Sequence, residues 1–452
     1  MIAVLLATVL AAPLPCGPLD LPTALSLASS RSDEVTIKNA EVAAAEADRA
    51  IARAVAILPQ ATATFIAGPA PGAHIPPGGT FLDSAQSNRG LTDIGPFGRV
   101  DVNVVQPLWT WGQLTAAKDA AQAGVRGKQL LLADTEHQVQ LRVVQLYWAV
   151  ALARKLLGLG NEVEGDLRDV EKRIEKSLAA ADGQLTQEDK FRVAIFRGDL
   201  EQRRADGQKA MRLARIGLAA TLAIAEPELQ LKDEALPTQP DTKTPDRDAA
   251  IRQAESARPD LLALDQAIAA LEAQAKANRA AELPQVFAAG TFAYSRAPNR
   301  DIVTNPWISD PFNTLTFGVV LGLRQNLALP TLTAQAEKAD AELARTRRQR
   351  DGLARLVTVQ TEQATAELLG AIDRHKAAQA AVIAGRSWFR TAGLNFGVGV
   401  SDAKALIEAY VGYFKTQLDS AQAIYELLLA RSHLDQVTGQ ALSKGESTCI
   451  LR

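Results

Sequence analysis

The sequence contains few of the residues that build catalytic and metal centres. Its 452 residues include two cysteines, two methionines and four histidines, and the histidines lack the spacing of metal ligands. No phosphate-binding glycine loop or nucleophile elbow occurs. The many Asp and Glu residues fall in helical patterns, where they are usually solvated. We therefore expect no catalytic residue, no cofactor, no metal and no enzymatic activity.

An excess of one charge is also missing. The formal net charge is −2, and nucleic-acid binding usually needs a concentrated basic face. The Arg-rich run at 345–350 is typical of a solvated helix face rather than of a binding patch. We expect no nucleic-acid partner.

Aromatic residues are scarce as well, at 5% of the chain, which favours closely packed Ala- and Leu-rich helices over a compact globular core. From Trp111 to about Leu178, and from Thr331 to Asn395, there is no proline and apolar residues recur at helical spacing. At ~1.5 Å per residue each helix would span about 100 Å, which implies a rod or a tube. Three glycines predict a local break in the first helix: Gly158, Gly160 and Gly165.

The N-terminal segment has the composition of a signal peptide. Residues 1–12 are apolar, too few to span a bilayer as a helix, and no Lys or Arg precedes them. Cys16 follows as a candidate for lipidation, although Pro15 replaces the small residue that lipoprotein signals need there. A disulfide with Cys449 and two ordinary thiols are the alternatives. We expect export.

The chain also contains an internal duplication. Four short segments recur in the same order: 30–33 as 257–260, 47–50 as 277–280, 58–60 as 283–285, and 183–186 as 398–401. A connector with four prolines separates the halves. We therefore predict these parts: 1–19 N-terminal segment with signal peptide, 20–225 first repeat, 226–246 linker, 247–440 second repeat and 441–452 tail.

Each half predicts the same order of elements: a helix, two strands, a very long helix, a tip and a returning helix. The strands are expected at 61–67, 99–108, 285–295 and 313–323, and the returning helices at 186–224 and 402–437. Proline is disfavoured inside helices and central strands. Four prolines are therefore predicted at helix–strand junctions: Pro59, Pro107, Pro284 and Pro330. Pro107 and Pro330 are expected to open the long helices.

The predicted strands have two unlike faces. In the last strand, large apolar residues from Leu315 to Leu323 alternate with small or polar ones. Strands of about 9–11 residues cross a bilayer when tilted, and the long polar loops at 68–98 and 296–311 are typical of a membrane barrel. Open edges are not tolerated in lipid, so three chains would have to supply about twelve strands. The alternative is an ordinary half-buried sheet in a soluble domain.

After about residue 20 the chain resembles the TolC-like outer-membrane efflux protein family, the outer-membrane factors. The resemblance lies in the duplicated Leu-Pro-Gln junctions and in residues 257–261, 392–397, 401–409 and 430–439. It implies a mainly α fold with a small β part. Long antiparallel α-helical hairpins would form a periplasmic α-barrel, and four strands per chain would contribute to a 12-stranded trimeric transmembrane β-barrel.

The resemblance also implies a function and partners. Such a protein is a homotrimer in the lipid of the outer membrane of a Gram-negative cell and extends into the periplasm. Its hairpin tips dock a periplasmic adaptor (membrane fusion) protein that serves an inner-membrane transporter, in tripartite efflux or type I secretion. By position, the tips here are Gly183, Gln184, Leu185, Thr186, Gly397, Val398, Gly399, Val400 and Ser401. The alternative is that these are turns without a docking role.

One stretch departs from the family pattern. Some members narrow the tunnel with rings of aspartate just before the second tip, but residues 384–392 contain no acidic residue. The candidate constriction consists of Arg386, Trp388, Phe389 and Arg390. Three-fold repetition of an arginine would give a cationic ring that favours anions. The alternative is that these side chains face outward or pair with acidic residues.

Two other functions compete with a channel. A periplasmic adaptor also has a long helical hairpin with β-domains, but it would have one hairpin rather than two copies with strand pairs. A structural coiled-coil protein of the cell envelope would explain the helices but not the alternating strands. The sequence does not distinguish drug efflux, metal efflux and protein secretion.

Overall fold

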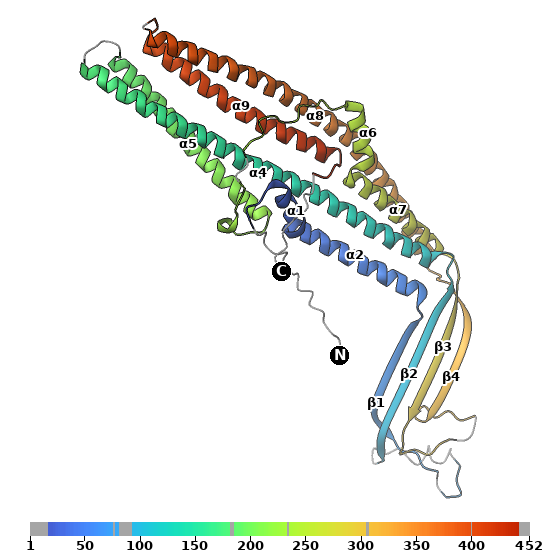
Figure 1. Ribbon diagram of the computed structural model, residues 1–452. Coiled ribbons are helices and arrows are strands. Elements are labelled where there is room, and N and C mark those ends of the chain that lie inside the picture. Colours follow the sequence, from blue (N-terminus) through green and yellow to red (C-terminus); the bar gives the residue numbers. More distant parts are fainter. Residues whose placement is uncertain are drawn as a thin grey trace. The chain divides into compact units, whose positions relative to one another are not determined.

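The computed structural model describes residues 17–75, 77–80, 93–180, 185–232, 235–303, 307–398 and 400–442. The predicted signal peptide, Cys16 and nearly all of the predicted tail lie outside these residues. The described chain is mainly helical, with one four-stranded antiparallel sheet (Figure 1). In the first half the elements are α1 (Leu21–Arg31), α2 (Asp33–Ile57), β1 (Gln60–Pro71), β2 (Ile94–Trp109), α4 (Gln113–Ala180) and α5 (Gln187–Thr221). A short 3-10 helix, η1 (Glu226–Glu228), follows, and then α6 (Arg247–Ala257), α7 (Pro259–Ala280), β3 (Gln285–Arg296), β4 (Thr314–Arg324), α8 (Leu329–Gly397) and α9 (Ala403–Val437).

The predicted order of helix, two strands, long helix and returning helix occurs in both halves. The chain nevertheless divides into two compact units that each draw on both halves. The helical unit comprises Met1–Ala43, Gly127–Asp265 and Gln349–Arg452, and the sheet unit comprises Ala44–Arg126 and Gln266–Arg348. These units do not follow the repeat boundaries, which stay a prediction.

The two long helices form as predicted, with 68 residues in α4 and 69 in α8. The predicted break in the first of them is wrong, because α4 runs without interruption through Gly158, Gly160 and Gly165. At Gly160 the reason is tertiary packing. A Cβ there would lie 3.2 Å from the side chain of Arg204 on α5, so the glycine lets the two helices approach closely.

Three of the four junction prolines lie where expected. Pro59 and Pro284 fall between a helix and a strand, and Pro330 is in the first turn of α8. The prediction for Pro107 is wrong, because it lies inside β2 and α4 begins only at Gln113. The strand tolerates it because β1 pairs with β2 no further than Val105, so its missing N–H removes no bond to β1.

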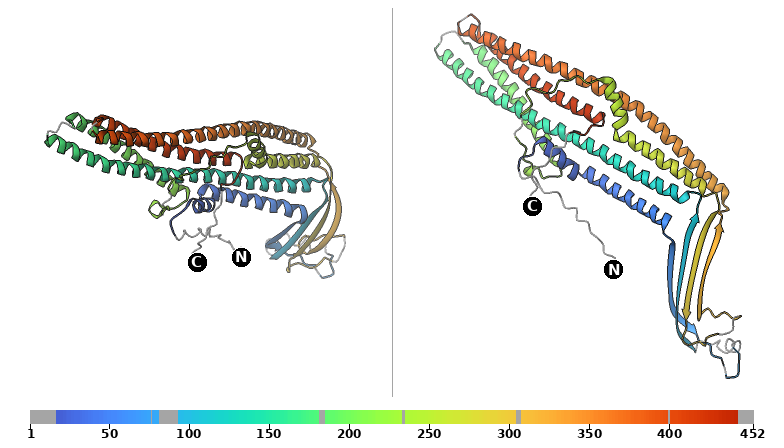
Figure 2. Two further views of the ribbon diagram at one scale, coloured as in Figure 1. Left: turned by 45° about the horizontal axis from the view of Figure 1, so that its top comes forward. Right: turned by 45° about the vertical axis from the view of Figure 1, so that its right-hand side comes forward.

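Apolar side chains on facing helices hold the helical unit together, where Figure 2 shows α5 beside α4 and α9 beside α8. One cluster joins α1, α4 and α5 through Leu25, Val143 and Leu218, all at most 2% exposed. A second cluster joins α4 and α5 to α9, where the ring of Phe196 lies edge-on to that of Phe414. These contacts connect the two helical hairpins of the chain.

One described helix, α4, contains an 18-residue window with a mean hydropathy of 1.2, and half of that window is buried inside the protein. Helices packed in a protein core have the same length and hydropathy, so these two properties alone do not make α4 a membrane-spanning helix.

Candidate functional site

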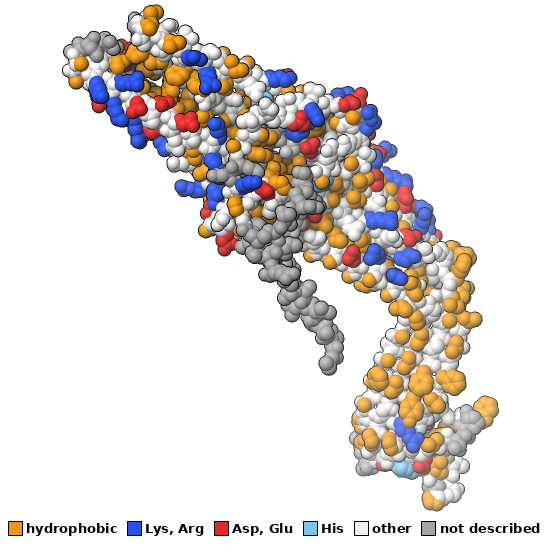
Figure 3. All heavy atoms as spheres, in the orientation of Figure 1, with side chains coloured by type: hydrophobic (Ala, Val, Ile, Leu, Met, Phe, Trp, Pro, Cys, Tyr) orange, Lys and Arg blue, Asp and Glu red, His pale blue; other side chains and the backbone are white. Residues whose placement is uncertain are grey.

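The sheet has one continuous apolar face. All three strand pairs are antiparallel, so directly opposite residues project to the same side. Three successive rows across β1 to β4 are Phe65, Val100, Tyr294 and Leu315; then Ala63, Val102, Phe292 and Phe317; then Ala61, Val104, Gly290 and Val319. Phe65, Phe317 and Val319 are 76%, 81% and 82% exposed. Hydrophobic side chains cover much of the visible sheet surface in Figure 3.

The opposite face of the sheet contains most of its polar and small side chains. Its rows include Thr64, Asp101, Ala293 and Thr316, followed by Thr62, Asn103, Thr291 and Gly318. Arg99 shares this face with Asp101, and its Nε and Nη2 donate to the carboxylate at 2.7 and 2.8 Å. The polar face thus contains an ion pair, and the apolar face contains no charge in these rows. Two such faces are typical of a membrane barrel, which has water on one side and lipid on the other.

The two outer strands are open within the chain. In the strand order β1-β2-β3-β4, β1 and β4 each have a single neighbour. Their outer N–H and C=O groups therefore have no strand partner in the described sheet. Open edges of this kind pair readily with other strands in water and are excluded from lipid, so the sheet is incomplete as a membrane structure.

Beyond the strands, polar side chains connect the two strand loops. Arg300, from the β3–β4 loop, lies 3.1 Å from Asp310 and donates to the carbonyl of Pro71 at 2.6 Å. Its guanidinium also lies 4.6 Å from the ring centre of Phe312. Asp310 is only 6% exposed, so the ion pair is fixed by its surroundings.

A histidine bridges the same two loops. His74 Nε2 lies 3.6 Å from Asp93, and its Nδ1 lies 3.6 Å from Asp301. The backbone N–H of Ile75, and then His74, hold the pKa of Asp301 below its ordinary value. The sequence predicted long polar loops here, and composition could not have shown these contacts because they join residues far apart in the chain.

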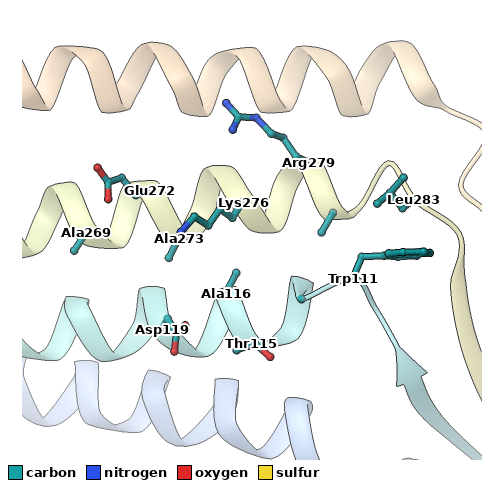
Figure 4. A pocket seen from close by; sticks show the side chains of 12 residues that line it. Trp111, Thr115, Ala116, Asp119, Ala269, Glu272, Ala273, Lys276, Arg279 and Leu283 are labelled. Carbon is teal, nitrogen blue, oxygen red and sulfur yellow. The ribbon is translucent and has the colours of Figure 1, made fainter.

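A groove of about 700 Å³ lies between the first turns of α4 and the end of α7, lined by Ala116, Asp119 and Lys276 among others (Figure 4). Two of its charged side chains are already paired with α8. Glu272 lies 2.6 Å from Arg347, and Arg279 lies 2.6 Å from Asp340. These pairs tie α7 to α8 and leave the groove without a concentrated charge of either sign.

At the first predicted tip, Leu185 and Thr186 lie between α4 and α5, whereas Gly183 and Gln184 are outside the described residues. Thr186 caps α5. Its Oγ1 accepts from the N–H of Asp189, and the Asp189 carboxylate accepts from the N–H of Thr186. Burial opposes ionisation of Asp189, but the hydrogen bonds from Thr186 and Arg192 prevail and lower its pKa.

At the second predicted tip, Gly397 is the last residue of α8, and Gly399 lies outside the described residues. Val398 and Val400 are 74% and 75% exposed. Asp402 caps α9 by accepting from the N–H of Ala405 at 2.9 Å. A capped turn thus presents apolar side chains to solvent, as a docking surface would. Ser401 lies in the same turn and is half-buried.

The four constriction candidates separate into two kinds. The ring of Phe389 is tilted against Tyr410 and stacked on Tyr413, with centroids 5.2 and 6.0 Å apart. Trp388 packs over Gly412, where an added Cβ would lie 2.6 Å from the indole. These aromatic residues therefore join α8 to α9. Arg386 and Arg390 are exposed and, four residues apart, project from the same side of α8.

A known protein family and several solved structures are similar to this chain. Residues 250–440 match the family model described as outer membrane efflux protein. The chain is similar in structure to a membrane protein from Pseudomonas aeruginosa (TM-score 0.75, 16% identity, 96% of this chain and 98% of that one). It is also similar to the Campylobacter jejuni CmeC outer membrane channel (TM-score 0.73, 12% identity, 94% and 87%). The Neisseria gonorrhoeae MtrE outer membrane channel in its open state is a third (TM-score 0.70, 15% identity, 94% and 90%).

No curated protein matches the chain by sequence. At these identities the solved structures show the fold, and the predicted fold class is confirmed. The family match supplies the location, which is the outer membrane.

Proposed function

We propose that the chain, whose residues 250–440 match the outer membrane efflux protein family, is the exit duct of a tripartite efflux or type I secretion system. As a homotrimer it conducts substrates passively to the exterior. A periplasmic adaptor and an inner-membrane transporter deliver them to the duct.

The main support for this proposal is the open, incomplete sheet. It has an exposed apolar face, a polar face and two open edges. Each unsatisfied backbone group would cost several kcal/mol in lipid, so the edges must be closed by other strands. The four strands alternate in direction, so β4 of one copy can pair antiparallel with β1 of the next copy. Three copies then supply about twelve strands, within the range of membrane barrels.

The alternative functions explain fewer of these structural features. A half-buried sheet of a soluble domain would cover Phe317 and Val319, which are among the most exposed apolar residues described. A periplasmic adaptor or a structural protein of the envelope has no need for a bilayer-length apolar face. The match to the efflux family also favours a channel.

Reconstitution tests the proposal. In fractionated cells the protein should be found in the outer membrane as a heat-modifiable trimer. After purification it should form ion-conducting channels in planar bilayers. A water-soluble monomer that never conducts would contradict it.

The helix tips are the proposed contact with the adaptor. Exposed Val398 and Val400 and the capped turn of Thr186 support this role. In a chain whose two cysteines are replaced by serine, Val400→Cys should crosslink to one periplasmic protein of the adaptor class. Ile383→Cys is the matched control, because Ile383 is 69% exposed on α8 away from the turn. Equal crosslinking from both positions would refute a specific docking role.

A further inference from the structure

The last residues of β2 depart from a regular ladder. Up to Pro107, which lies opposite Phe287, each residue of β2 pairs in turn with the preceding residue of β3. The next residue of β3, Val286, then pairs with Trp109 and not with Leu108. Leu108 is therefore an extra residue, and β2 has a β-bulge just before α4.

The bulge decides which face Trp109 occupies. Alternation from Val100, Val102 and Val104 would put Trp109 on the polar face of the sheet. The inserted residue reverses this and places Trp109 opposite Val286, on the apolar face. The indole is 58% exposed there, although large aromatic side chains are usually buried.

A second tryptophan supports the first. Trp111 lies edge-on to Trp109 with the ring centroids 5.9 Å apart. Its backbone has a φ of 54°, which is unusual for a bulky residue, and its indole N–H donates to the carbonyl of Pro284 at 2.6 Å. Figure 4 shows Trp111 beside Leu283, where α4 begins and α7 has ended. Trp111 is thus held by the strand–helix junction, and Trp109, the more exposed of the two at 58% against 49%, lies on the apolar face of the sheet.

The opposite boundary of the apolar face is Arg296, which lies opposite Gly98. Between Val286 and Arg296 the strand rises about 34 Å at ~3.4 Å per residue, or about 26 Å along the barrel axis for a tilt of ~40°. The rows of the described sheet in this interval contain no charged side chain on the apolar face. The apolar band of outer-membrane barrels is about 25 Å tall, so Trp109 and Arg296 mark its two edges.

We propose that the bulge at Leu108 aims Trp109 into the phospholipid headgroup region on the helical side of the bilayer. There it sets the depth at which the barrel sits, with Trp111 as its support. An indole suits this region because its ring is apolar and its N–H can bind headgroups. The inference rests on the proposed outer-membrane channel.

Depth-dependent fluorescence quenching tests it. In the test protein Phe replaces Trp111, Trp148, Trp307 and Trp388, so that Trp109 is the only tryptophan. The trimer is reconstituted in phosphatidylcholine brominated near the headgroup or near the bilayer centre, and tryptophan is excited selectively. Lipid brominated near the headgroup should quench Trp109 severalfold more strongly than lipid brominated near the centre. A second protein that keeps Trp111 should show the same order of quenching by the two lipids. That result would show that the quenching of Trp109 does not arise from loss of the hydrogen bond between Trp111 and Pro284.

A mid-face reporter separates this inference from the proposed function. With all five tryptophans replaced, Phe317→Trp should be quenched best by lipid brominated near the centre. If that reporter behaves so while Trp109 responds only to aqueous quenchers, or most to central bromines, the anchor is refuted and the channel stands. If lipid quenches neither position, the apolar face is not in a bilayer and both fail.

Discussion

At the scale of single residues, glycines and aromatic rings set how closely the helices pack. Gly412 on α9 faces the indole of Trp388, and an added Cβ would lie 2.6 Å from Cζ3. Gly412→Ala should therefore destabilise the helical unit by about 1–3 kcal/mol, although alanine favours helix formation. Urea unfolding of the trimer in detergent measures this. Gly393→Ala is the control, because its nearest neighbour is at an ordinary 3.9 Å. Equal effects of the two substitutions would contradict the packing argument.

Glu41 should make the stability of the helical unit depend on pH. Its two oxygens lie 2.8 Å from Lys128 and 2.7 Å from Lys38, and these contacts lower its pKa to about 2. Because the folded-state pKa is depressed, the stabilisation is complete above the ordinary carboxyl pKa and is lost as the pH falls through about 2. Glu41→Gln should lower the melting temperature at pH 7, and the difference from the unsubstituted protein should shrink below about pH 4.

Lys128→Met provides the internal control for Glu41. It should remove much of the same pH-dependent stabilisation, and the double variant should be less destabilised than the sum of the two single variants. Additive effects that do not change with pH would show that the contact between Glu41 and Lys128 contributes nothing.

Arg386 and Arg390 should influence which ions pass the proposed duct. If their side chains form cationic rings, Arg390→Ala should reduce the preference for anions in reversal-potential measurements on single channels. Arg374→Ala is a suitable control, since Arg374 pairs with Glu426 at 3.1 Å on the neighbouring helix. Unchanged ion selectivity in both Arg386→Ala and Arg390→Ala would contradict a cationic ring at this position.

At the scale of elements, the sequence predicted most helices and strands to within a few residues. Prolines and alternation are local signals, and Pro59 and Pro284 lie where a helix has ended and a strand begins. The errors have tertiary causes. Gly160 did not break α4 because α5 packs against it, and Pro107 was accommodated where β2 has lost β1 as a neighbour. The bulge at Leu108 depends on register with β3, which no local pattern contains.

The two faces of β4 should respond differently to charge. Val319 lies on the apolar face and its neighbour Val320 on the polar face, and both are more than half exposed. Val319→Lys should cost about 2–4 kcal/mol and reduce the fraction of folded trimer in outer membranes, because a cation would face lipid. Val320→Lys should be tolerated. The heat-modifiable band on gels measures both, and equal assembly of the two variants would contradict the face assignment.

At the scale of the whole molecule, each compact unit is assembled from both halves of the sequence. In the sheet unit β2 pairs with β3, and in the helical unit Phe196 contacts Phe414, so neither half contains a complete core. The duplication was visible in the sequence as repeated Leu-Pro-Gln segments. The division into units was not, because it follows contacts between helices far apart in the chain.

Closure of the sheet by neighbouring copies is the central claim, and disulfide trapping across the edges of the sheet tests it most directly. In a background of Cys16→Ser and Cys449→Ser, Ala63→Cys on β1 is combined in turn with Phe317→Cys, Val319→Cys or Leu321→Cys on β4. Within one chain β2 and β3 separate these positions by about 14 Å, too far for a disulfide. The account predicts that oxidation of outer membranes links chains into dimers and trimers and no further. Chains that stay monomeric with every pair, or products that extend beyond three, would contradict it.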